Sequence, residues 1–154
     1  MLEAFQMLCP GCVSHGLPQA SRVHQTFDRT RVAVIGLHTV FEHHQVMTKD
    51  ALGVFIHEYR IPFPIGADTP GFGNDIPRTM KSYGMQGTPT LVLIDQLGRI
   101  RQQHFGSVPD LQLGAEISAL LCESESAKAA NNQQVDTASD VAAQCSTQGC
   151  PMER

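Results

Sequence analysis

The stretch Leu2-Glu3-Ala4-Phe5-Gln6-Met7-Leu8-Cys9-Pro10-Gly11-Cys12 places two cysteines, separated by two residues, directly after an apolar run. The run predicts a strand over residues 2–7, and the residues after it predict a helix. The first turn of a helix has unpaired N–H groups and a partial positive charge, so a sulfur atom held there is stabilised as a thiolate. We therefore expect Cys9 to be the nucleophile and Cys12, one turn later, to resolve the mixed disulfide.

Two other interpretations of this cysteine pair stay open, namely half of a zinc site and two buried thiols without chemistry. Zinc needs a second pair of ligands, which Cys145 and Cys150 would supply only through an unusual spacing. The strand-to-helix context favours redox chemistry. Pro10 and Gly11 lie between the cysteines and carry no charge, which favours a reducing or intermediate potential over an oxidising one.

A second segment, Gly87-Thr88-Pro89-Thr90, precedes the apolar run 91–95, and a further strand follows over residues 100–105. A proline cannot donate a hydrogen bond to a neighbouring strand, so Pro89 belongs at the start of its strand. The Thr88–Pro89 bond is the candidate for a cis peptide. The two strands after it are expected to form a hairpin.

The CxxC pair and the Gly-Thr-Pro segment together resemble the thioredoxin superfamily. The likeness is greatest to its TlpA/ResA-like, redoxin-type thiol:disulfide oxidoreductases and covers about residues 1–122. It implies an α/β three-layer sandwich, in which a central mixed sheet has helices on both faces. It also implies exchange with protein disulfides, an upstream thiol electron donor and no cofactor. The family's catalytic and substrate-binding positions match Cys9, Cys12, Thr88, Pro89, Pro10 and Gly11.

Glu3 lies six positions before the first cysteine, where thioredoxins have an acid beneath the second cysteine. The resemblance implies that Glu3 accepts or delivers the proton of Cys12. If the side chain is buried, desolvation raises its pKa and makes it a proton acceptor near neutral pH. The alternative is a strand glutamate that faces solvent.

Composition bounds the other possibilities. The chain has 154 residues, 42% of them hydrophobic, which is enough for one core and hardly for two. A formal charge of −4 argues against nucleic acid or an anionic membrane as the partner. No apolar run approaches the ~20 residues of a membrane span, and no signal peptide is recognisable. The expected location is therefore cytoplasmic for the sequence as written, or periplasmic if a leader has been removed.

The rest of the chain predicts alternating helices and strands. The first helix is expected from about Pro10 to Phe27, with a kink near Gly16 and Pro18. A buried strand is predicted at 32–37, one short strand within the loop 62–77, a short helix at 76–84 and a last helix at 109–121. Thr48 is the expected N-cap of a helix that ends near Tyr59. The side chains that should point inward from that helix are Leu52, Phe55, Ile56 and Tyr59.

Residues 123–154 differ from the domain at 1–122. Ser, Ala, Asn, Gln and Asp predominate over residues 123–144, so this part is expected to be a flexible tail. It ends in a pair of thiols, Cys145 and Cys150. These thiols could relay electrons to the active site, could bind a soft metal together with Met152, or could be incidental.

Three functions are weighed. The first is a thiol:disulfide oxidoreductase, and the second is a metal-binding or copper chaperone-like protein that uses the same cysteines with His104 or the tail thiols. Adjacent His43 and His44 would point apart on a regular element, so no metal ligand is assigned. The third is a thiol peroxidase, which is disfavoured because Gln6 and Leu2 occupy the positions of a peroxiredoxin's threonine and proline.

Overall fold

The computed structural model of the protein describes residues 1–72 and 76–126. All its strands and named helices lie in one compact unit, Met1–Ile117. A second unit begins at Ser118, and its described residues, 118–126, are helical. Within the described residues, no helix is long and apolar enough to cross a membrane. The predicted tail beyond residue 126, with both of its thiols, lies outside the described residues.

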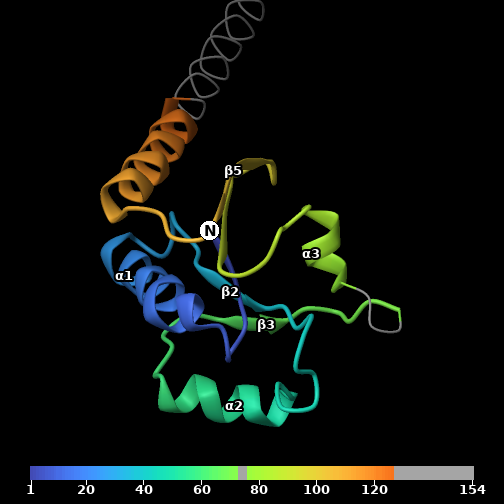
Figure 1. Cartoon of the computed structure of the whole chain (residues 1–154). Coiled ribbons are helices and arrows are strands. Elements are labelled where there is room, and N and C mark those ends of the chain that lie inside the picture. Colours follow the sequence, from blue (N-terminus) through green and yellow to red (C-terminus); the bar gives the residue numbers. More distant parts are fainter. Residues whose placement is uncertain (73–75, 127–154) are drawn as a thin grey trace, which may run out of the picture. The chain divides into compact units, whose positions relative to one another are not determined.

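A mixed five-stranded sheet forms the centre of the first unit, with strand order β3-β2-β1-β4-β5 (Figure 1). The strands are β1 (Leu2–Phe5), β2 (Ile35–His38), β3 (Ile65–Ala67), β4 (Thr90–Ile94) and β5 (Ile100–Phe105). The first three are parallel, whereas β4 is antiparallel to both β1 and β5. The carboxyl ends of β1, β2 and β3 therefore meet at one edge of the sheet, from which the segment with both cysteines leaves β1.

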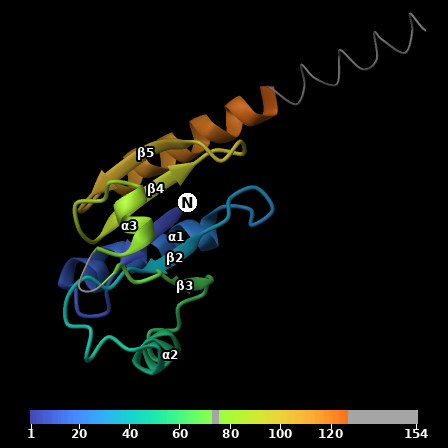
Figure 2. The same cartoon turned by 90° about the vertical axis from the view of Figure 1, so that its right-hand side faces the viewer.

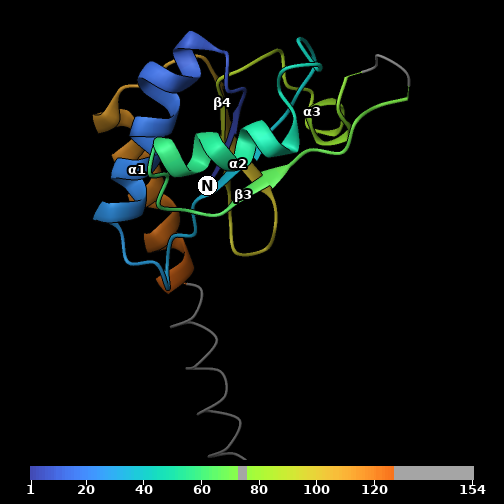
Figure 3. The ribbon, with the colours of Figure 1, turned by 90° about the horizontal axis from the view of Figure 1, so that it is seen from below.

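The helices lie on both faces of this sheet, which confirms the predicted α/β sandwich. Helix α1 (Leu17–Thr26) and helix α3 (Arg78–Ser82) lie on opposite faces (Figures 1 and 2). On the face of α3, Ala4 and Val92 pack against two buried methionines, Met80 and Met85. Helix α2 (Lys49–Glu58) lies on the same face as α1 (Figure 3), where its Phe55 ring stacks on that of Phe5 in β1 at a centroid distance of 6.1 Å. Residues 110–117 are also helical.

The first predicted helix is irregular near the place where a kink was expected. A π-helical turn, η1 (Cys12–Gly16), precedes α1, and the N–H of Leu17 donates to the carbonyl of Cys12, five residues earlier. The kink expected near Gly16 and Pro18 is therefore a widened turn just before α1. Pro18 has no N–H to contribute there, and it fits the first turn of α1, where N–H groups are free.

Two details of the predicted elements were wrong. Strand β2 begins at Ile35 and not at residue 32, because its first partner is Leu2, near the start of β1. Tyr59 does not point inward, since it is 56% exposed and its ring stacks on that of Phe55 at a centroid distance of 4.3 Å. Thr48 is the N-cap of α2, as predicted, because its hydroxyl accepts the N–H of Ala51 at 3.2 Å.

Candidate active site

The two cysteines of the CxxC segment are both free thiols and lie at the start of the helical segment after β1. The backbone N–H of Cys12 donates to Cys9 Sγ at 3.2 Å, and the Cys9 thiol donates to the carbonyl of Thr88 at 3.4 Å. Cys9 is partly exposed, whereas Cys12 is completely buried. Cys9 is therefore the more accessible of the two cysteines, and the N–H group next to its sulfur atom stabilises negative charge there.

The environment of Cys12 differs sharply from that of Cys9. Burial is the main reason why the pKa of the Cys12 thiol is raised to about 12, and its hydrogen bond with Cys9 acts in the same direction. The backbone of Gln6 donates a hydrogen bond that acts to lower this pKa, but burial outweighs it. Cys12 therefore keeps its proton at neutral pH, and it needs a base when it has to react.

The loop before β4 faces the cysteines. The Thr88–Pro89 peptide bond is cis. A Cβ atom added to Gly11 would lie 3.3 Å from Pro89 Cδ, so the backbone between the two cysteines is in close contact with this loop. The fold thus brings together two segments that are separated by nearly eighty residues in the sequence.

Glu3 lies in the middle of the sheet, paired with Gly36 of β2 and Leu91 of β4. The residue is 1% exposed, and its Oε1 atom has no hydrogen-bond partner among the residues that the structure describes. Burial raises the pKa of the Glu3 carboxyl to about 8. The alternative of a glutamate facing solvent is therefore wrong, and Glu3 holds a proton whose release falls near neutral pH.

Other side chains considered for metal binding lie apart from the cysteines or outside the described residues. His104 Nε2 is paired with Glu116 Oε2 at 2.8 Å, and His43 and His44 are exposed. In residues 1–72 and 76–126, no group of three or more His, Cys, Asp or Glu side chains is arranged to hold a metal ion. Cys145 and Cys150 lie outside the described part of the chain.

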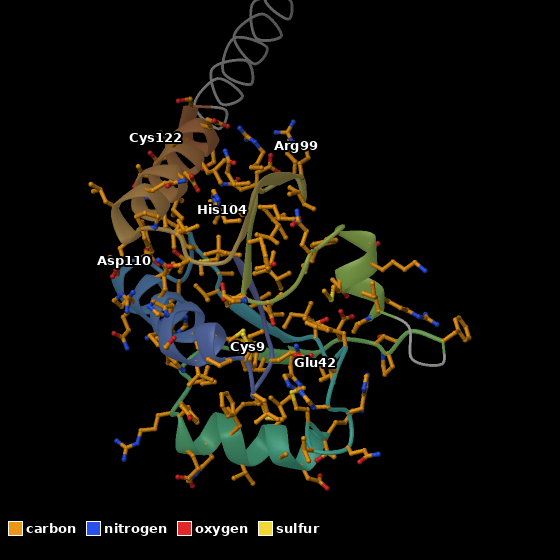
Figure 4. The ribbon with its side chains drawn as sticks, viewed as in Figure 1. Cys9, Glu42, Arg99, His104, Asp110 and Cys122 are labelled. Atoms are coloured by element: carbon orange, nitrogen blue, oxygen red, sulfur yellow. The ribbon has the colours of Figure 1, made fainter. Side chains whose placement is uncertain are left out.

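Two residues near the cysteines did not emerge as site residues from the sequence. Gln6 is buried, its carbonyl accepts the N–H of Cys9 at 3.2 Å, and its side-chain amide donates to Glu42 at 3.4 Å. Figure 4 shows Cys9 at the beginning of the helical segment and Glu42 in the segment after β2. A polar residue within the apolar run before the CxxC was the available signal for Gln6. Gly16 is the second such residue, because its backbone lies against the Glu3 carboxyl group and Pro89.

Several solved structures are similar to this chain in both sequence and fold. A thioredoxin-like superfamily protein is 60% identical, with a TM-score of 0.76, and the match covers 78% of this chain and 77% of that one. A thiol-disulfide isomerase from Corynebacterium glutamicum is 56% identical, with a TM-score of 0.76 and 78% of each chain covered. StoA from Bacillus subtilis is 26% identical, with a TM-score of 0.57, over 73% of this chain and 76% of that one. No family model and no curated protein matches the chain.

Proposed function

The chain belongs to the thioredoxin-like superfamily, and on that premise we propose that it is a thiol:disulfide oxidoreductase whose Cys9/Cys12 pair reduces disulfides in protein substrates. The observation that carries the proposal is the contrast between the two sulfurs. The accessible Cys9 sulfur accepts an N–H bond at 3.2 Å, while Cys12 is buried behind it with its proton retained. One thiol is suited to attack, and the other to resolve.

The reaction proceeds through two exchanges. The Cys9 thiolate attacks one sulfur of the substrate disulfide, so a Cys9–substrate disulfide forms and the other substrate sulfur leaves as a thiolate, which takes up a proton. Cys12 then loses its proton and attacks Cys9 Sγ. The Cys9–Cys12 disulfide forms, and the second substrate sulfur leaves. The substrate gains two electrons and two protons, and an upstream dithiol donor must return the Cys9–Cys12 disulfide to the reduced form.

The residues next to the accessible sulfur are proposed to bind the substrate backbone. Thr88 O lies 3.4 Å from Cys9 Sγ, so a main-chain N–H group of an extended substrate segment can reach this carbonyl. Pro10 is exposed and Gly11 is half-buried, and together with Pro89 they border the sulfur without a bulky polar side chain. Thr88, Pro89, Pro10 and Gly11 are therefore the proposed substrate contacts.

Glu3 is the proposed acceptor of the Cys12 proton. Desolvation raises the pKa of its buried carboxyl group to about 8, so the carboxylate form that can take up the Cys12 proton becomes more populated as the pH rises toward that value. The reducing direction is supported by the uncharged pair Pro10-Gly11 between the cysteines. A relay through Cys145 and Cys150 and the cellular location stay predictions.

Trapping of mixed disulfides tests the assignment of the two thiols. Cys12→Ser in the full chain should accumulate covalent adducts with a disulfide-containing protein, because the Cys12 thiol that resolves the Cys9–substrate bond is missing. Cys9→Ser should give at least ten-fold less adduct. Non-reducing electrophoresis quantifies the adducts, and peptide mapping identifies the cysteine that carries them.

The exposed Cys122 provides the control, because Cys122→Ser should behave like the wild-type chain. Adducts on Cys12 in the Cys9→Ser variant, at the level seen for Cys12→Ser, would reverse the roles. Absence of adducts in both variants, with no reduction of the substrate by wild-type protein, would refute the proposed function.

A further inference from the structure

The π-helical turn after the CxxC changes which backbone atoms face the sheet. In η1 the N–H of Leu17 reaches back five residues to the carbonyl of Cys12, whereas an α-helix would connect residues four apart. Such widened turns occur often at functional sites. Here the wide turn ends at Gly16, which is buried.

Gly16 lies directly against the Glu3 carboxyl group. A Cβ atom built on Gly16 would overlap Glu3 Oε1 and would lie 3.2 Å from Glu3 Cδ. Atoms of these kinds need more space than that, so no side chain at position 16 is compatible with the present place of the carboxyl group. The buried, unpartnered oxygen of Glu3 thus occupies the volume that a side chain of residue 16 would take.

The same glycine also borders the cis-proline loop. A Cβ atom on Gly16 would lie 3.1 Å from Pro89 Cβ, and one on Gly11 would lie 3.3 Å from Pro89 Cδ. Pro89 therefore contacts the helical segment at two glycines that are five residues apart. Because the π-helical turn connects residues five apart, it brings both glycines toward this loop.

We infer that Gly16 is a positioning residue, whose missing side chain lets the π-helical turn pack on Pro89 while the Glu3 carboxyl group stays buried beneath it. This inference deepens the proposed function. It rests on that function only in taking Glu3 as the acceptor of the Cys12 proton. Any side chain at position 16 must turn the carboxyl group away or lift the helical segment from the sheet. Either movement admits water to Glu3 and moves Cys12 relative to its proposed proton acceptor.

The test is a titration of the Glu3 carboxyl carbon by NMR in reduced full-length protein, with Gly16→Ala compared with the wild type. The wild-type pKa should lie near 8 because of burial. In Gly16→Ala it should fall by at least one unit, toward the ordinary value, because water reaches the carboxylate. The pH at which the rate of disulfide reduction changes should move in the same direction.

Gly53→Ala provides a matched control. Gly53 lies in α2, and a Cβ atom added there meets no atom within 4 Å outside its own stretch of helix backbone, so this variant adds the same methyl group where there is room for it. Its Glu3 titration and pH profile should equal those of the wild type. If Gly16→Ala also leaves both unchanged, Gly16 does not position Glu3 and the inference is wrong.

A double-mutant cycle with Glu3→Ala covers the case in which Gly16→Ala folds poorly. Removal of the carboxyl group makes room for the new methyl group, so Gly16→Ala should destabilise the Glu3→Ala chain markedly less than the wild type. Equal destabilisation in both backgrounds would overturn the inference. The titration and the cycle need no activity, so they can fail or succeed independently of the trapping experiment that tests the proposed function.

Discussion

At the scale of single residues, Glu3 has the largest consequence for the behaviour of the protein with pH. Its folded-state pKa of about 8 lies above its ordinary value of 4.5, because burial disfavours the charged form. The folded protein therefore binds this proton more tightly than the unfolded chain does, so protonation of Glu3 favours folding. That contribution is fully present below the pKa of the unfolded chain and is lost as the pH rises from there to the folded-state pKa.

Glu3→Gln should remove this dependence, since the amide has nearly the same shape and does not ionise. The wild-type free energy of unfolding should decrease between about pH 4.5 and 8 relative to that of Glu3→Gln, by ~1.4 kcal/mol per unit of pKa shift. Urea unfolding under reducing conditions at a series of pH values measures this decrease. Glu58→Gln, at an exposed site of α2, should keep the wild-type dependence. Parallel curves for the wild type and Glu3→Gln would show that Glu3 is not titrating as a buried group.

At the scale of elements, the first turns of the helices depend on different sources of hydrogen bonds. In α2 the Thr48 side chain accepts the N–H of Ala51. In α3 the N-cap is Pro77 and the acceptor comes from another segment, since the Asp68 carboxylate receives the N–H groups of Thr79 and Met80. A local cap of the first kind can be recognised in the sequence, whereas the second kind depends on the segment just after β3 lying against the start of α3.

Thr48→Ala should destabilise the protein by about 1 kcal/mol, because the N–H of Ala51 loses its acceptor. Thr48→Ser keeps the hydroxyl group and should retain most of the wild-type stability. The free energy of unfolding from urea titrations measures both variants. A loss of equal size in the serine variant would mean that the methyl group, and not the cap, stabilises the start of α2.

At the scale of the first compact unit, the helix that follows the cysteines is linked to residues about ninety positions later. Gln19 of α1 is buried, and its side-chain amide donates to the carbonyl of Val108 and to Asp110 Oδ1, each at 2.7 Å. Arg22 pairs with the same carboxylate at 3.0 Å. These contacts connect α1 to the beginning of the helical residues 110–117 and so help to hold the helix after the CxxC in place.

Gln19→Ala should lower the free energy of unfolding by about 1–3 kcal/mol, because it leaves the buried carbonyl of Val108 without its hydrogen-bond donor. Gln112→Ala is the matched control, since the Gln112 side chain makes an exposed hydrogen bond with Glu116 and should lose less than about 0.5 kcal/mol. Urea unfolding of the two variants measures both losses in the free energy of unfolding. Equal losses would show that the link between α1 and Val108 contributes little.

Local signals in the sequence were sufficient to predict the class of fold and the family, whereas the chemistry of Cys9 and Cys12 stays a proposal. Two cysteines between a strand and a helix, a proline at the start of another strand and a threonine before a helix are each features of neighbouring residues. Their physical basis, in helix N-termini, missing N–H groups and capping, is local as well. The α/β sandwich and the membership of the thioredoxin-like superfamily followed from them.

Only the tertiary structure decided which groups meet. The burial of Glu3 results from its register between β2 and β4, and the need for glycine at position 16 results from the helical segment packing on that carboxyl group. The exposure of Tyr59 and the late start of β2 have the same origin. Periodicity along a chain predicts an element and its apolar face, but the atoms opposite that face come from residues distant in sequence, and only packing determines them.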